Sequence, residues 1–262
     1  MYENNWESLN SRPVPEWFGD AKFGIFIHWG LYSIPAYAPV KDYAEWYGYA
    51  CNIEKPEHPS HDKYKAYHKE HYNSRPYYDF INDFTGYRFD AAKWAELFQR
   101  AGAKYINFVS KHHDGYCLYE TEYAPGLNSV ECAPKRDFLM ELKEALAKTD
   151  VRFGVYHSVY EWFHPTYLKN PEQYAVEHLI PMLKELVEKC GIIGNHNDFK
   201  RTVETLAGAF HRFYIVLSDL SYVVRNFFKR AVSCADDILK NTADIVVKLR
   251  ICDDIVASVL YA

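Results

Sequence analysis

The sequence predicts an α/β protein built from parallel βα units, with a (β/α) barrel as the architecture. The evidence is a pattern that occurs three times: an apolar run of strand length ends in polar or aromatic residues. The runs are 22–30 (KFGIFIHWG), 104–115 (KYINFVSKHHDG) and 151–158 (VRFGVYHS). Helix-like segments separate the runs, so right-handed parallel crossovers are expected between them. Because parallel strands end at one rim, the polar residues are expected to line one common pocket.

The segment between the first two strands is expected to lie on the surface. Residues 31–50 form a loop rich in proline and tyrosine, and residues 52–88 form a polar excursion with a short helix. None of the histidine spacings in the excursion matches the pattern of a zinc-binding helix, so a solvated face is predicted. These histidines are His58, His61, His68 and His71.

Helices are predicted where apolar residues recur at helical spacing. An amphipathic helix is expected over 90–102, with Asp90 as the N-cap and Gly102 as the stop. The next helix is expected over 137–148, ahead of the third strand. A further helix over 171–189 carries its core positions at Leu179, Met182, Leu183, Leu186 and Val187.

The pattern changes beyond residue 189. Residues 203–260 carry apolar residues at helical intervals without another strand that ends in polar residues, which predicts two to four amphipathic helices. Two domains are therefore expected. Residues 1–198 form a partial (β/α)-barrel domain, and 199–262 form a helical segment in place of the later barrel units.

Composition restricts the class of ligand. The formal charge is -5 and no dense cluster of Lys and Arg occurs, so a nucleic-acid partner is not expected. Aromatic residues make up 17% of the chain. They suit the apolar faces of sugars, and the alternative is that they fill a large core. We expect no membrane span, no signal peptide in the sequence given, no metal and no cofactor.

Three short constellations are the candidates for ligand binding. They are His28-Trp29, Glu45-Trp46, and the run His112-His113-Asp114. Neighbouring side chains on a strand point to opposite faces, so both histidines can face the pocket only if the backbone turns at Gly115. Asp114 is expected to accept backbone N–H groups at that turn.

Five segments together resemble the amino-terminal half of the animal-type α-L-fucosidases. They are WFGDAKFGIFIHWGLYSIPA (17–36), AEWYGYA (44–50), AGAKYINFVSKHHDGYCLYETEYA (101–124), APKRDFLMEL (133–142) and RFGVYHSVYEWFHPTYL (152–168). The resemblance covers about residues 6–189. It implies a (β/α)-barrel glycoside hydrolase, lysosomal or secreted, that removes terminal fucose from glycoconjugates and retains anomeric configuration through a covalent fucosyl intermediate.

The resemblance also implies roles for individual residues. His28 would hydrogen-bond fucose hydroxyls, Glu45 and Trp46 would hold the sugar and stack on it, and His112 and His113 would contact it from the second strand. Tyr156 or His157 would line the pocket near the reacting carbon. The full set of expected sugar contacts is His28, Trp29, Glu45, Trp46, His112, His113, Tyr156 and His157.

The family nucleophile is an aspartate at the end of the next barrel strand. In this chain the preceding ELVEK helix ends at Lys189, and by spacing Asp198 falls at the nucleophile position. Nothing in 199–262 matches the family acid/base. Two alternatives follow: a catalytically inactive fucose-binding remnant, or an interaction module in which the helical segment binds a partner.

Overall fold

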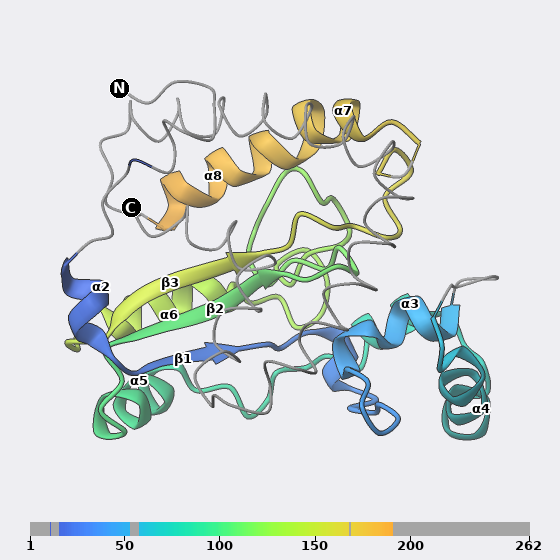
Figure 1. Ribbon diagram of the computed structural model, residues 1–262, viewed down its shortest axis with the longest axis horizontal. Coiled ribbons are helices and arrows are strands. Elements are labelled where there is room, and N and C mark those ends of the chain that lie inside the picture. The colour runs from blue at the N-terminus through green and yellow to red at the C-terminus, as the bar shows by residue number, and fades with distance from the viewer. Residues whose placement is uncertain (1–10, 12–15, 53–57, 168, 191–262) are drawn as a thin grey trace, which may run out of the picture.

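The fold is organised around a parallel three-stranded sheet. The computed structural model describes residue 11 and residues 16–52, 58–167 and 169–190. The sheet has the order β1-β2-β3, formed by Gly24–Ile27, Tyr105–Lys111 and Arg152–His157 (Figure 1). Gly24 pairs with Tyr105, which pairs with Arg152, so the strands run level and end at the same edge. The three predicted strands and their parallel order are confirmed.

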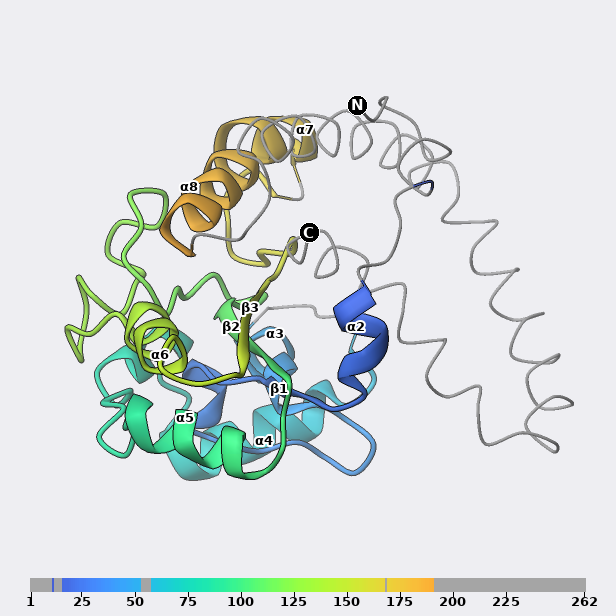
Figure 2. The same ribbon diagram turned by 90° about the vertical axis from the view of Figure 1, so that its left-hand side faces the viewer.

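Two helices cover one face of this sheet. α5 (Ala91–Arg100) and α6 (Phe138–Leu146) lie side by side against it (Figure 2). Asp90 begins α5 by accepting the N–H of Lys93 at 3.1 Å, as predicted, and Asp137 accepts the N–H of Met140 at 2.9 Å at the start of α6. These caps satisfy donors that a helix start leaves without partners.

An aromatic core fills the space between the sheet and these helices. The Trp29 ring lies 4.8 Å from both Phe84 and Phe138 and stacks at 5.5 Å on Phe89. Phe108 of β2 is buried in the same cluster. Much of the aromatic content therefore packs the core, as the alternative explanation of the composition expected.

The excursion between β1 and β2 is partly a core element. It contains η1 (Leu31–Ser33), η2 (Ala44–Trp46), α3 (Tyr47–Asn52), α4 (His61–Tyr72) and η3 (Tyr77–Ile81). The predicted solvated histidine face is wrong for His68, which is 4% exposed, with Nδ1 2.9 Å from the Tyr47 hydroxyl and Nε2 2.7 Å from the Arg75 carbonyl. The reason is that Tyr64 and His68 share one helix face, which packs inward.

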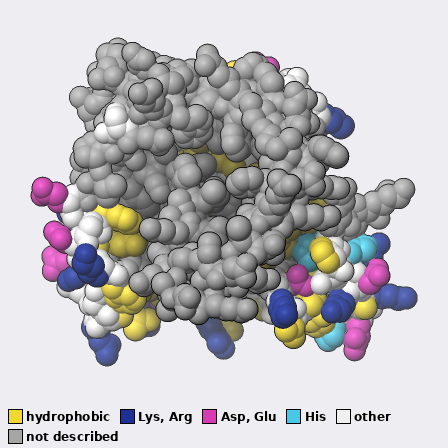
Figure 3. Space-filling model, in the orientation of Figure 1, with side chains coloured by type: hydrophobic (Ala, Val, Ile, Leu, Met, Phe, Trp, Pro, Cys, Tyr) yellow, Lys and Arg dark blue, Asp and Glu magenta, His cyan; other side chains and the backbone are white. Residues whose placement is uncertain are grey.

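The outer side of the excursion is solvated. Histidine, acidic and basic side chains gather over α3 and α4 on the face shown in Figure 3. His71 is exposed on α4, as predicted.

The predicted helix over 171–189 is interrupted. It consists of α7 (Pro171–Tyr174), a π-helical turn η4 (Ala175–Leu179) and α8 (Ile180–Cys190). Its five predicted core positions are all buried. A short helix that was not predicted, α2 (Glu16–Ala21), precedes β1. Within the described part of the chain, no helix has the length and apolar character to cross a membrane.

Candidate functional site at the carboxyl ends of the strands

Side chains from three strands meet at the carboxyl edge of the sheet. The His28 ring, just after β1, lies 5.3 Å from His112 and 5.4 Å from Tyr156 of β3. The rings of His112 and His113, just after β2, lie 4.1 Å apart. We call His28, His112, His113 and Tyr156 the strand-end cluster. The prediction that these strand ends bring polar residues together is confirmed.

A tight turn explains how two adjacent histidines lie on one side. β2 ends at Lys111, and the N–H of Gly115 donates to the carbonyl of His112 at 3.1 Å. Gly115 has a φ of +82°, a conformation that disfavours other residues. The alternation of a strand no longer applies after Lys111, so both rings can join the cluster.

Asp114 holds this turn in place. Its carboxylate accepts the Tyr77 hydroxyl at 2.7 Å and the N–H of Tyr116 at 3.2 Å. Burial raises the pKa of Asp114 to about 6, although these two hydrogen bonds act in the opposite direction. The expected role of Asp114 as an acceptor at the turn is confirmed.

An aromatic wall stands beside His113. The His113 ring lies 5.8 Å from Trp46, 4.9 Å from Trp162 and 5.2 Å from Tyr160. Trp46 comes from η2, so the loop after β1 reaches the same site as predicted, whereas Tyr160 and Trp162 were not predicted. The YEW run in the loop after β3 was the available signal for these two rings.

Glu45 and Tyr32 extend the site on the side of the first loop. The Tyr32 ring lies 5.2 Å from His112. Burial raises the pKa of Tyr32, and the negative charges of Asp114 and Glu45 raise it further. Glu45, half-buried, is therefore close enough to act electrostatically on the rim of the cluster. Tyr32 was not predicted as a site residue.

Within the cluster, His112 and His113 are polar and uncharged at neutral pH. Burial lowers the pKa of His112 well below its ordinary value, and burial followed by the Lys111 charge lowers the pKa of His113 to about 3. Nδ1 of His112, which is 5% exposed, and the Tyr32 hydroxyl have no hydrogen-bond partner among the described residues. A buried polar atom without a partner is costly, so a ligand hydroxyl placed here would gain affinity.

Two predicted contacts lie apart from the cluster. Trp29 follows His28 and points to the opposite face, where its ring packs in the aromatic core. His157 follows Tyr156 in the same way, and its Nδ1 lies 2.9 Å from the Ser110 hydroxyl. Alternation along a strand explains both positions. Their sugar contacts remain predictions, and Asp198 lies outside the described residues.

A buried ion pair lies directly behind the cluster. Lys111 is 0% and Glu161 4% exposed, and Nζ donates to Oε2 at 2.6 Å. The Tyr174 hydroxyl donates to the same oxygen at 3.1 Å, and His178 Nε2 lies 3.1 Å from it. Burial alone would raise the pKa of Glu161, but the Lys111 charge and His178 lower it well below its usual range. These four side chains were not predicted as part of a site.

The same region contains a set of possible metal ligands. Ligand atoms of Glu161, His164 and His178 all lie within 4.8 Å of one another. The Lys111 ammonium, however, already lies against the Glu161 carboxylate, and a divalent cation would have to displace that buried charge. The arrangement favours an ion-pair network over a metal centre.

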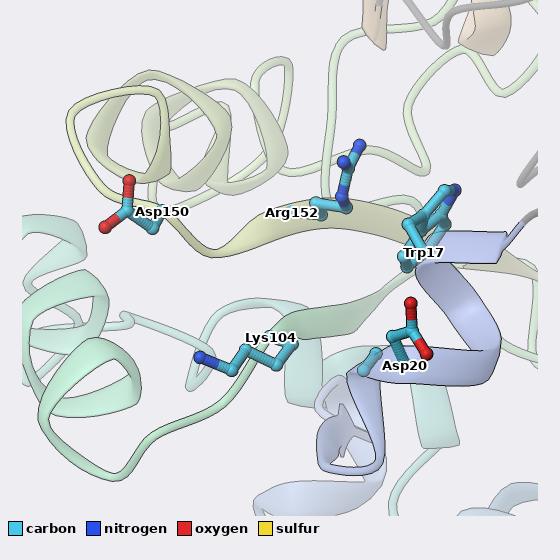
Figure 4. Close-up of a pocket in the computed structure, with 6 residues that line it drawn as sticks. Trp17, Asp20, Lys104, Asp150 and Arg152 are labelled. Atoms are coloured by element: carbon cyan, nitrogen blue, oxygen red, sulfur yellow. The ribbon is translucent and has the colours of Figure 1, made fainter.

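A cavity of about 340 Å³ lies at the other end of the sheet. It is lined by Trp17, Asp20, Ala21, Lys104, Asp150 and Arg152, near the starts of β2 and β3 (Figure 4). The Arg152 guanidinium lies 4.6 Å from the centre of the Trp17 ring, and the charged groups balance in sign. No member of the strand-end cluster lines this cavity, so we place the candidate site at the carboxyl edge.

The comparisons with known proteins identify the family of the chain. The family model described as Alpha-L-fucosidase matches residues 1–220. The chain belongs to the α-L-fucosidase family. The predicted family resemblance is confirmed, and the match continues beyond the predicted domain boundary at residue 198.

Relatives and solved structures from distant organisms support this assignment. The chain is 40% identical over 197 residues to the plasma alpha-L-fucosidase of Homo sapiens, covering 74% of this chain and 40% of that protein. It is 41% identical over 198 residues to the alpha-L-fucosidase of Dictyostelium discoideum, covering 71% and 42%.

A crystal structure of the Thermotoga maritima alpha-fucosidase with a mechanism-based inhibitor matches with a TM-score of 0.61 at 38% identity, covering 72% of this chain and 47% of that one. The chain thus spans less than half the length of these relatives.

Proposed function

We propose that the strand-end cluster binds the terminal fucose of a fucosylated glycan, and that this chain acts in an α-L-fucosidase-type glycoside hydrolase with a (β/α)-barrel catalytic domain. The observation that carries the proposal is the convergence of three strand ends on the strand-end cluster, in which burial keeps the imidazoles of His112 and His113 neutral. Neutral imidazole both donates and accepts hydrogen bonds, which suits the hydroxyls of an uncharged sugar. The ring of Trp46 adds an apolar surface for the face of the sugar.

The proposed reaction is a retaining double displacement. One carboxylate attacks the anomeric carbon, and a second carboxyl group about 5–5.5 Å away protonates the departing oxygen. Near the cluster, Asp114 is committed to the turn and Glu161 to Lys111. Glu45 remains as a sugar-binding carboxylate. We therefore keep Asp198 as the proposed nucleophile, on its spacing from the ELVEK helix alone.

Turnover of an aryl α-L-fucoside tests this proposal. The wild-type chain should release the aglycone, and Asp198→Asn should lose at least about a hundredfold in kcat while retaining fucose affinity, because the attacking group alone is removed. Asp62→Asn, an exposed aspartate on α4, is the matched control. Equal rates for Asp198→Asn and the wild type would remove Asp198 from the mechanism.

A second candidate function is fucose binding without hydrolysis. The residues proposed to bind the sugar lie in segments that resemble the family, whereas Asp198 is placed by spacing alone and nothing in 199–262 matches the family acid/base. Fucose binding with no release of aglycone at high enzyme concentration would establish this second function.

We propose a lysosomal or secreted location for the chain. The relatives include enzymes named plasma and tissue alpha-L-fucosidases. Immunolocalisation of the expressed full-length gene product would test this, and a cytosolic distribution would contradict it.

A further inference from the structure

Three buried side chains and the half-buried His178 form a network behind the cluster, centred on Glu161. We call Lys111, Glu161, Tyr174 and His178 the Glu161 network. Three groups converge on the single oxygen Oε2: the Lys111 ammonium at 2.6 Å, the Tyr174 hydroxyl at 3.1 Å and His178 Nε2 at 3.1 Å. They come from the end of β2, from α7 and from the π-helical turn η4. These three hydrogen bonds, which come from three different elements, hold the Glu161 carboxylate in one position.

The network joins the two segments that hold His113. Lys111 directly precedes His112, and its carbonyl accepts the N–H of Ser158 at 3.0 Å. Glu161 lies between Tyr160 and Trp162, two of the rings that contact His113. The N–H of Trp162 donates to the His113 carbonyl at 2.9 Å. The ion pair therefore ties the β2 end to the loop after β3.

Ser158 connects the loop after β3 to the His113 ring. Its hydroxyl lies 2.5 Å from His113 Nδ1, and the N–H of Tyr160 donates to the same hydroxyl at 3.0 Å. The partner at Nδ1 sets which nitrogen of His113 is presented to a ligand. A displaced loop would move Ser158 and release the ring.

Glu161 is also confined from the side of the turn. A Cβ added at Gly115 would lie 3.1 Å from Glu161 Oε1 and 3.2 Å from its Cγ. The turn that carries His112 and His113 thus packs directly on the carboxylate. Bonds on one side and close packing on the other hold the loop against the turn.

A buried ion pair is poor evidence for stability in its own right. Taking two charges out of water is expensive, and apolar residues of similar volume often replace such a pair without loss of stability. Apolar residues, however, do not form the directional hydrogen bonds that orient a neighbouring segment. A role in orientation accounts for the directional bonds that converge on Oε2.

We propose that Glu161 is a positioning residue, which through the Glu161 network fixes Ser158 and Trp162 so that the His113 ring is held in its ligand-binding orientation. The proposal deepens the proposed function, because the ligand it serves is the fucose assigned to the strand-end cluster. Glu161 itself acts through His113 and need not touch the sugar.

The decisive variant replaces the charges and keeps the volume. The double variant Lys111→Met/Glu161→Leu should remain folded with an unchanged or higher thermal midpoint, yet bind L-fucose roughly tenfold more weakly, about the loss of one good hydrogen bond. Titration calorimetry measures the affinity. The ¹⁵N resonances of the His113 ring should shift at the same time, because Nδ1 loses its fixed partner.

A milder variant keeps the test decisive if the double variant does not fold. Tyr174→Phe removes one hydroxyl from Oε2 and keeps the ring, so it should weaken fucose binding a few-fold and shift the His113 resonances in the same direction. Glu96→Gln, which neutralises the exposed partner of Arg100 on α5, should change neither quantity.

The outcomes separate this proposal from the function on which it rests. A folded variant with unchanged fucose affinity and unchanged His113 resonances would show that the network is structural only, and would overturn the proposal. If the wild type fails to bind fucose, the proposed function fails, and the His113 resonances still decide whether Glu161 positions the ring.

Discussion

At the scale of single residues, the site depends on His112 and His113, whose imidazoles are kept neutral by burial. A charged imidazole can only donate hydrogen bonds, whereas a neutral one offers both a donor and an acceptor. Nδ1 of His112, which no described residue hydrogen-bonds, and the exposed ring of His28 belong to the same cluster. The cluster can therefore match the mixed donor and acceptor pattern of sugar hydroxyls.

Replacing His28 by Ala should weaken fucose binding. A sugar hydroxyl would be left buried without a partner, at about 1–3 kcal/mol, or roughly 5- to 150-fold in Kd. Titration calorimetry with L-fucose measures the change. His71→Ala, on the exposed side of α4, is the matched control and should bind like the wild type. Equal affinity for both variants would place His28 outside the binding site.

The lowered pKa of His113 predicts a pH-dependent stability. The pKa of this ring falls from its ordinary value of 6.5 to about 3 on folding. Between those values the unfolded chain binds the proton and the folded chain does not, so this contribution to the free energy of unfolding decreases as the pH falls. The full slope for one proton is about 1.4 kcal/mol per pH unit.

Comparison with His113→Asn isolates that slope. Relative to this variant, the wild type should lose free energy of unfolding as the pH is lowered from 6.5 towards 3, measured by urea unfolding. Asp114, whose pKa is raised to about 6, contributes with the opposite sign, because the folded state takes up its proton first. Asp114 is present in both proteins, so its contribution cancels in the difference between their free energies of unfolding. A difference that stays constant with pH would contradict the buried neutral state of His113.

At the scale of elements, sequence patterns predicted the strands and capped helices well. Asp90 and Gly102 marked α5 because capping and left-handed termination depend on local chemistry. The π-helical turn η4 was not visible as a break, since apolar spacing continues through it. The burial of His68 was also missed, because its partners Tyr47 and Arg75 come from other segments.

The turn after β2 should not tolerate a side chain at Gly115. Gly115→Ala introduces a Cβ at φ +82° and 3.1 Å from Glu161 Oε1. Gly102→Ala shares the same φ but meets nothing within 4 Å, so it reports backbone strain alone, about 1–2 kcal/mol. Gly115→Ala should lower the free energy of unfolding further than Gly102→Ala and shift the His113 ring resonances. Equal losses for the two variants would show that Glu161 yields to the added methyl group.

At the scale of the whole molecule, the parallel order of the sheet creates the site. Three strands that end at one edge bring together residues separated by more than a hundred positions in the chain, such as His28 and Tyr156. The same order leaves the cavity near Trp17 and Arg152 at the opposite end (Figure 4). The location of the proposed site follows from the order of the strands and not from the position of this cavity.

Deletion of residues 200–262 tests how the chain is organised. The family match continues to residue 220, so the cut removes family sequence and should lower the thermal midpoint and the solubility of the remaining protein. Circular dichroism and size-exclusion chromatography measure both. A deleted protein that stays folded and soluble, and loses only a binding partner, would instead support the interaction module.

The sequence alone determined the strands, their polar ends, the helix caps and the family. Each of these depends on local patterns: alternation, capping chemistry, or motifs several residues long. Only the tertiary structure decided which rings face the site. It placed Trp29 and His157 away from the cluster, and it added Tyr160, Trp162 and the Glu161 network. These positions depend on the order of the strands, on the turn after Lys111 and on contacts between residues far apart in the sequence. No short sequence motif contains that information.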